Sequence, residues 1–222
     1  MLYLLTGEIQ TGKTRWLEAR LAQLEAAGVD VRGVLSPGVW VPGAEGGFEK
    51  LGIDLVFYPG HERVRFADRL SPDEVSEVDE DGYGDEDDIL TGVSLPGEVP
   101  APAPVPVTVA GKVLGWKFYP FFFGKVNGLF TDLRGDEPAE GAAKRLVVLD
   151  EIGRMELVGR GFTDAMAFLA DGENPAWPHV VAVVRSELLQ RAWELLAPSW
   201  GDGMRIIHPD EEGERALFNL FG

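Results

Sequence analysis

The chain has 222 residues, 45% of them apolar, and a formal net charge of −17 at neutral pH. This length suits one large domain with a substantial core, and the negative charge argues against general affinity for nucleic acid or anionic membranes. Cysteine is absent, which excludes disulfides, thiolate catalysis and cysteine-ligated metal sites. Neither a signal peptide nor an apolar run of membrane-spanning length is visible, so we expect a cytoplasmic protein.

The first fifteen residues carry the most specific motif. A short apolar run, Leu2 to Leu5, has the length of a strand, and a helix pattern with leucines on one face runs to a C-capping Gly28. Between them lies a segment that matches the phosphate-binding loop G-x-x-x-x-G-K-[ST]. The predicted nucleotide-binding residues are Gly7, Glu8, Ile9, Gln10, Thr11, Gly12, Lys13, Thr14 and Arg15.

The residue types fit the chemistry of a phosphate site. Gly7 and Gly12 give the backbone the freedom to turn successive N–H groups toward phosphate oxygens. The helix that follows adds the partial positive charge of its N-terminus. Lys13 is predicted to reach the β- and γ-phosphates as a catalytic cation, and the Thr14 hydroxyl to ligate Mg²⁺.

Two alternating stretches follow the first helix. Val29 to Leu35 predicts the second strand, and the segments around Trp40 and from Leu51 to Tyr58 flank a glycine-rich turn. Two strands around such a turn predict an antiparallel hairpin added to the edge of the sheet. Trp40 is expected to pack on a half-buried strand rather than stack on a base.

The composition then changes abruptly. Between Ser71 and Leu90 there are ten acids and no base, and prolines follow from Pro96 to Pro106. Such a segment favours an extended, solvated conformation and has too few apolar residues to build a core. We therefore expect one domain over residues 1–222 with a mobile insertion at 71–107, whose protein partner the sequence does not specify.

An aromatic cluster follows a further strand or hairpin over Val107 to Tyr119. Its members are Phe118, Tyr119, Phe121, Phe122 and Phe123. It could wall a base or substrate pocket beside Lys117 and Lys125, and packing against the sheet is the favoured alternative.

A continuous apolar run, Leu146 to Leu149, predicts a central parallel strand buried on both faces. It ends in Asp150 and Glu151, at the edge where α/β sheets bind ligands. Asp150 is predicted to hold Mg²⁺ through the metal's water shell, and Glu151 to orient or activate the attacking water.

The rest of the chain repeats the helix and strand rhythm. We expect a helix over Phe162 to Leu169, a strand over His179 to Val184, a helix capped by Ser186, a strand over Met204 to Ile207 and a closing helix over Glu211 to Phe221. Strands that alternate with helices predict a three-layer α/β fold with a mainly parallel sheet. The three histidines share no metal-ligand spacing and are expected to be structural.

Three segments together resemble the THEP1-type nucleoside-triphosphatases. They are TGEIQTGKT near the start, GVLSPG after the second strand, and DEIGRMEL from Asp150 to Leu157. The resemblance implies a RecA-like α/β P-loop fold, to which the hairpin predicted above is added. It also implies Mg²⁺ as cofactor and hydrolysis of ATP, GTP and other nucleoside triphosphates to diphosphate and phosphate.

The chain departs from the family pattern at a few positions. Arg15 stands where the family usually has Thr or Ser, and Arg154 where Lys is usual. The family's C-terminal Asn-Arg element is not evident near His208 to Asp210. Two other functions stay open beside the triphosphatase: a kinase for a small molecule, nucleoside or nucleotide that uses the same loop, and a nucleotide-dependent binding module with incidental turnover.

Overall fold

The computed structural model describes residues 1–8, 11–43, 46–75, 103–109 and 112–222. Ile9 and Gln10 of the loop, and most of the expected insertion (76–102), lie outside the described residues. The last residues of that insertion, from Val105, belong to a strand. In the described part of the chain, no helix is long and apolar enough to cross a membrane.

The described strands form one ten-stranded sheet. They are β1 (Leu2–Leu5), β2 (Asp30–Leu35), β3 (Gly38–Pro42), β4 (Phe48–Tyr58), β5 (Glu62–Arg69), β6 (Val105–Val109), β7 (Lys112–Phe118), β8 (Arg145–Ile152), β9 (His179–Val184) and β10 (Met204–Ile207). The longer helices are α1 (Lys13–Ala26), α3 (Phe121–Gly135), α4 (Thr163–Ala170), α5 (Leu189–Trp200) and α6 (Glu211–Phe218). Four 3-10 turns lie at Ala142–Lys144, Glu156–Val158, Ser186–Leu188 and Gly201–Gly203.

Half of the sheet is parallel and has the order β10-β1-β9-β8-β2. Numbered in chain order, these five strands are arranged 5-1-4-3-2, so β9 separates the strand before the phosphate loop from the strand that ends in Asp150. The close approach of β2 to β8 requires Gly33, because a Cβ there would lie 1.9 Å from the Val148 carbonyl oxygen. Because β1, β9 and β8 are parallel neighbours, their carboxyl ends meet at one edge of the sheet.

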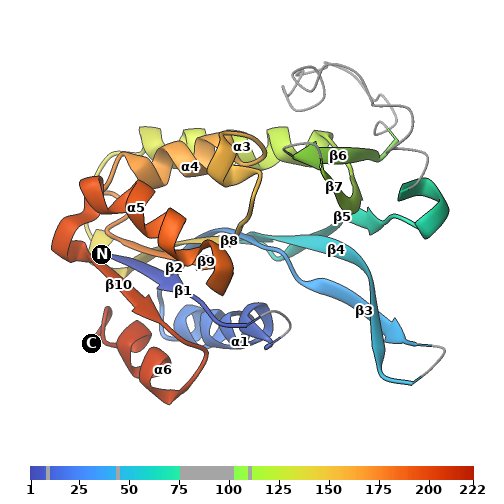
Figure 1. The fold of residues 1–222 in the computed structure, drawn as a ribbon. Coiled ribbons are helices and arrows are strands. Elements are labelled where there is room, and N and C mark those ends of the chain that lie inside the picture. Colours follow the sequence, from blue (N-terminus) through green and yellow to red (C-terminus); the bar gives the residue numbers. More distant parts are fainter. Residues whose placement is uncertain (9–10, 44–45, 76–102, 110–111) are drawn as a thin grey trace.

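The other half is antiparallel. β4 pairs with β2, and β5, β7 and β6 follow it in that order, while β3 pairs with β4. The expected hairpin is thus β3 with the first part of β4, and it projects from the rest of the sheet (Figure 1). The antiparallel part also contains β5, which the sequence analysis did not predict.

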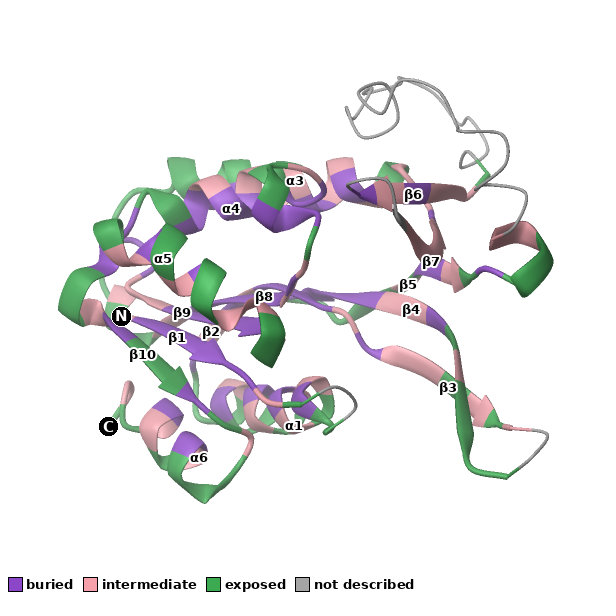
Figure 2. Cartoon of the chain, viewed as in Figure 1, coloured by how far each residue is buried: buried purple, intermediate pink, exposed green. Residues whose placement is uncertain are grey.

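Helices cover both faces of the parallel half (Figure 1). α1 and α6 pack on one face, where Leu17, Leu21 and Leu217 join a core with β1 and β2. α3, α4 and α5 cover the other face and bury a larger core that includes Phe130 and Phe168. The strands between these layers are buried along most of their length (Figure 2). The predicted three-layer α/β fold is confirmed.

One helix was not predicted, and one local prediction needs correction. The second half of the aromatic cluster begins the unpredicted helix, since Phe121 is the first residue of the fifteen-residue helix α3. Ser186 does not cap α5: it begins a separate 3-10 turn, and no side chain caps the helix that follows.

Candidate functional site

The phosphate loop joins β1 to the N-terminus of α1, in the order that the sequence predicts. Gly12 is the N-cap of α1 and has a φ of 84°, in the left-handed region that favours glycine. Gly7 faces the inside of the loop, where an added Cβ would lie 3.3 Å from Thr11 Oγ1 and 3.7 Å from Lys13 Cδ. Both glycines are therefore needed for this loop conformation.

Lys13 reaches back into the loop. Its ammonium nitrogen donates hydrogen bonds to the carbonyl oxygens of Gly7 (2.8 Å) and Glu8 (2.7 Å), and the residue is only 9% exposed. Thr11 Oγ1 also donates to the Glu8 carbonyl oxygen, at 2.8 Å. The loop thus holds one buried positive charge, while Glu8 and Arg15 are exposed.

Asp150 lies near the carboxyl end of β8, at the same edge of the sheet as the phosphate loop, and it is almost fully buried, at 1% exposure. Its carboxylate accepts a hydrogen bond from the backbone N–H of Ser36, at 3.0 Å, and the Thr14 hydroxyl lies close enough to favour its charged form. The Ser36 hydroxyl donates to the Asp150 carbonyl oxygen. The structure therefore brings together the two residues predicted to hold a metal ion, although they are far apart in the sequence.

Burial has a large effect on Asp150. It raises the pKa of this carboxyl to about 6, and the negative charge of Glu151 adds to the increase. The hydrogen bond from the Ser36 N–H, the nearby Thr14 hydroxyl and the charge of Lys50 lower the pKa and act in the opposite direction. A carboxylate in such a place is stabilised when a cation comes close.

These donors fit magnesium. A carboxylate and a hydroxyl are hard oxygen ligands, and Mg²⁺ in phosphate-binding sites takes one or two protein ligands and keeps several waters or phosphate oxygens. In the described ranges, no three His, Cys, Asp or Glu residues form a metal cluster. The residues that would hold Mg²⁺ are thus Thr14 and, through water, Asp150.

Glu151 forms an ion pair with a residue that the sequence analysis missed. Arg185 Nε donates a hydrogen bond to Glu151 Oε1. Arg185 is the first residue after β9, the strand that lies between β1 and β8. Its position after a buried apolar strand is the one sequence signal that could have identified it.

Glu156 belongs to the same DEIGRMEL segment as Asp150 and Glu151, and its contacts are with the backbone of that region. It is 8% exposed and accepts hydrogen bonds from the backbone N–H groups of Gly153 (2.9 Å) and Phe162 (3.3 Å). Burial raises the pKa of this carboxyl to about 7. Gly161 leaves room for it, since a Cβ there would lie 2.4 Å from Glu156 Oε1. Glu156 therefore fastens the turn after β8.

The aromatic cluster belongs mainly to the core, as the favoured alternative expected. Phe118 and Phe123 are buried, and both rings pack against Phe66. The two lysines beside the cluster are engaged elsewhere, since Lys117 pairs with Glu74 and Lys125 with Glu62. The buried members of the cluster thus serve as core packing.

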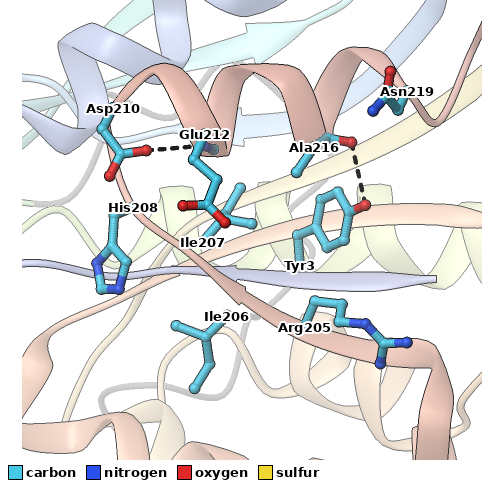
Figure 3. A pocket seen from close by; sticks show the side chains of 10 residues that line it. Tyr3, Arg205, Ile206, Ile207, His208, Asp210, Glu212, Ala216 and Asn219 are labelled. Carbon is cyan, nitrogen blue, oxygen red and sulfur yellow. Dashed lines mark hydrogen bonds between the residues drawn. The ribbon is translucent and has the colours of Figure 1, made fainter.

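A hollow of about 440 Å³ lies between β10 and α6 (Figure 3). Its lining includes Tyr3, His208 and Asp210, and the Tyr3 hydroxyl donates to the Ala216 carbonyl oxygen at 3.2 Å. The turn after β10 also approaches the phosphate loop, because a Cβ added at Gly7 would lie 3.8 Å from Pro209 Cδ.

Comparison with known proteins supports the fold. No protein-family model matches the chain, and no curated protein matches it in sequence. Among solved structures, it is similar to the crystal structure of THEP1 from the hyperthermophile Aquifex aeolicus, with a TM-score of 0.57 and 16% identity over 100% of this chain and 99% of that chain. At this level of identity the likeness concerns the fold, and the chain has the α/β fold of a THEP1-like P-loop protein.

Proposed function

We propose that this protein is a Mg²⁺-dependent nucleoside-triphosphatase that hydrolyses ATP, GTP and related triphosphates to diphosphate and phosphate. The observation that carries the proposal is that the Thr14 hydroxyl lies close enough to the buried Asp150 carboxylate to favour its charged form. This proximity joins the phosphate loop to the acid at the end of β8, which is the pairing needed to hold a metal ion against nucleotide phosphates. We place this activity in the cytoplasm, with small nucleotides rather than nucleic acid or membranes as partners.

Each residue has a distinct role in this proposal. The loop N–H groups and the N-terminus of α1 bind the phosphates, and Lys13 exchanges its bonds to the loop carbonyls for bonds to phosphate oxygens. Mg²⁺, when bound, neutralises charge on the β- and γ-phosphates. Thr14 and Asp150 hold its position.

Glu151 acts on the water in the chemical step. It orients the water in line with the γ-phosphorus and accepts a proton from it. The water oxygen bonds to phosphorus, and the bond to the bridging oxygen breaks with its electron pair left on the diphosphate. The ion pair with Arg185 fixes the carboxylate of Glu151, so that it does not have to find its position during the reaction.

The test is a release assay with the purified protein and each of the four nucleoside triphosphates, with Mg²⁺ or with a chelator. We expect steady release of phosphate that requires Mg²⁺ and no added acceptor. Phosphate transfer only after an acceptor is added would replace this proposal with the kinase. Tight binding with negligible turnover would replace it with the binding module.

A further inference from the structure

Lys50 lies in the projecting hairpin, yet its side chain turns toward the candidate site. It is on β4, opposite Trp40 of β3, and its aliphatic stem crosses the backbone at Gly38. A Cβ at Gly38 would lie 2.7 Å from Lys50 Cε. Gly38 follows Ser36 by two residues, and Ser36 is bonded to Asp150. The hairpin therefore carries a lysine back to the residues around Asp150.

The charges that act on Lys50 are those of the site. In order of size they are Glu151, Arg185 and Asp150, and burial outweighs them and lowers the pKa of the ammonium. Its nitrogen lies over the Trp116 ring, 5.1 Å from the centroid. Within the described part of the chain it forms no ion pair with a carboxylate.

Among the described residues, this arrangement leaves Lys50 as a cation of the site with neither an ion pair nor a hydrogen-bonded carbonyl. Lys13 donates hydrogen bonds to loop carbonyl oxygens, and Arg185 forms an ion pair with Glu151. A half-buried ammonium loses hydration, and contact with one aromatic ring compensates for only part of that loss. Such a group is well placed to receive an anion that arrives with the ligand.

The location of Lys50 indicates which part of a nucleotide it meets. The phosphate loop and Lys13 approach from β1 and α1, whereas Lys50 approaches from the antiparallel half of the sheet. The charges around it include Glu151, the residue proposed to handle the water. The water attacks at the outer end of the triphosphate. The group that Lys50 would meet in a bound nucleotide is therefore the terminal phosphate.

We propose that Lys50 is a further catalytic residue whose ammonium contacts the terminal phosphate of the bound nucleoside triphosphate and stabilises its charge during transfer. This inference rests on the proposed function and deepens it. It also gives the β3–β4 hairpin a role, because the hairpin delivers a cation that the phosphate loop does not contain.

The experiment compares triphosphate with diphosphate binding. Calorimetry with Mg²⁺ measures the affinity for the β,γ-imido analogues of ATP and GTP and for ADP and GDP. The variants are Lys50→Gln, which keeps the stem, and Lys50→Arg, which keeps the charge. Lys144→Gln is the matched control, since Lys144 is an exposed lysine at the amino end of β8. Thermal melting checks that each variant folds.

We expect Lys50→Gln to weaken analogue binding roughly tenfold or more and to leave diphosphate binding within about twofold. Single-turnover hydrolysis should fall further, and Lys50→Arg should recover part of both losses. Parent-like analogue affinity, or equal losses for triphosphate and diphosphate, would overturn the role of Lys50. Failure of the proposed function looks different, because the parent itself would then bind no triphosphate, or Lys13→Ala would bind it as well as the parent.

Discussion

Arg185 and Glu151 form an ion pair between the ends of two adjacent parallel strands, β9 and β8. Both side chains are partly exposed, with 40% and 29% of their side-chain surface accessible. The pair therefore contributes little to stability, because exposed ion pairs are typically worth less than about 1 kcal/mol. Its effect is to restrict the rotamers of Glu151.

We expect Arg185→Gln to lower the single-turnover rate of hydrolysis by roughly 10- to 100-fold, because a misplaced catalytic group is costly even over short distances. Affinity for a magnesium–triphosphate complex should change much less. Arg185→Lys should recover part of the rate. Arg134→Gln is the control, since Arg134 forms a comparable exposed ion pair with Asp171 away from the site. A purely structural role would instead lower the melting temperature and leave the rate per folded molecule intact.

Glu151→Gln separates hydrolysis from simple binding. The amide keeps the size of the side chain and removes the basic carboxylate, so kcat should fall by roughly 10²-fold or more while binding of the magnesium–triphosphate complex stays close to that of the parent. Asp150→Asn should instead weaken metal affinity. Rapid-quench measurements with labelled triphosphate distinguish a slower chemical step from slower product release.

A parental rate in Glu151→Gln would mean that another group handles the water. Glu156 is a poor substitute, because it is buried and bonded to the N–H groups of Gly153 and Phe162. Glu8 is exposed in the phosphate loop and would be the next residue to test.

Lys13→Ala should weaken binding of MgATP and MgGTP by roughly 10- to 100-fold, the cost of losing charge-assisted hydrogen bonds to phosphate. Thr14→Ala should reduce Mg²⁺-dependent turnover more than metal-free binding. Titration calorimetry measures both effects, and Lys144→Ala serves as the control. Unchanged affinity in Lys13→Ala would refute the phosphate-loop assignment.

Sequence patterns predicted the elements with regular periodicity. β1, α1, β2, β8, β9 and β10 all lie where an apolar run or a helical stripe placed them. The phosphate loop was also evident, because its glycines and lysine occur at a fixed spacing within eight residues. These features depend on local sequence, and local sequence is what such patterns report.

The elements that were missed depend on packing. α3 begins with three phenylalanines and contains glycines that disfavour a helix, yet Phe123, Val126, Phe130 and Leu133 all face the core. β5 lacked a recognised signal, because charged residues occupy most of its positions. Tertiary contacts decide the conformation of both segments.

The site residues that belong to a sequence motif were predictable, whereas the residues that other strands bring to the site were not. Arg185 is 34 positions from Glu151 and is brought to it by the insertion of β9 between β1 and β8. Lys50 precedes Asp150 by a hundred positions, and the hairpin brings it close enough for the two charges to interact. Neither residue belongs to a motif, so only the strand order reveals them.

Glu156 gives a prediction about stability that is independent of catalysis. Its folded pKa of about 7 is raised from a reference value of 4.5, chiefly by burial. A raised carboxyl pKa means that the folded state binds its proton more tightly than the unfolded state. The stabilisation is therefore fully present below about pH 4.5 and is lost as the pH rises through about 7.

The measurement compares the parent with Glu156→Gln in denaturant titrations from pH 4.5 to 7.5, without nucleotide or metal. The free energy of unfolding of the parent, relative to the variant, should fall by roughly 3 kcal/mol over this range, at about 1.4 kcal/mol for each pH unit. Asp150, whose pKa is also raised, is present in both proteins and cancels in the difference. Glu137→Gln, at an exposed position, gives the background. A difference between parent and Glu156→Gln that stays constant with pH would mean that Glu156 is not protonated in the folded state, and that its two backbone hydrogen bonds are enough to hold the charged form.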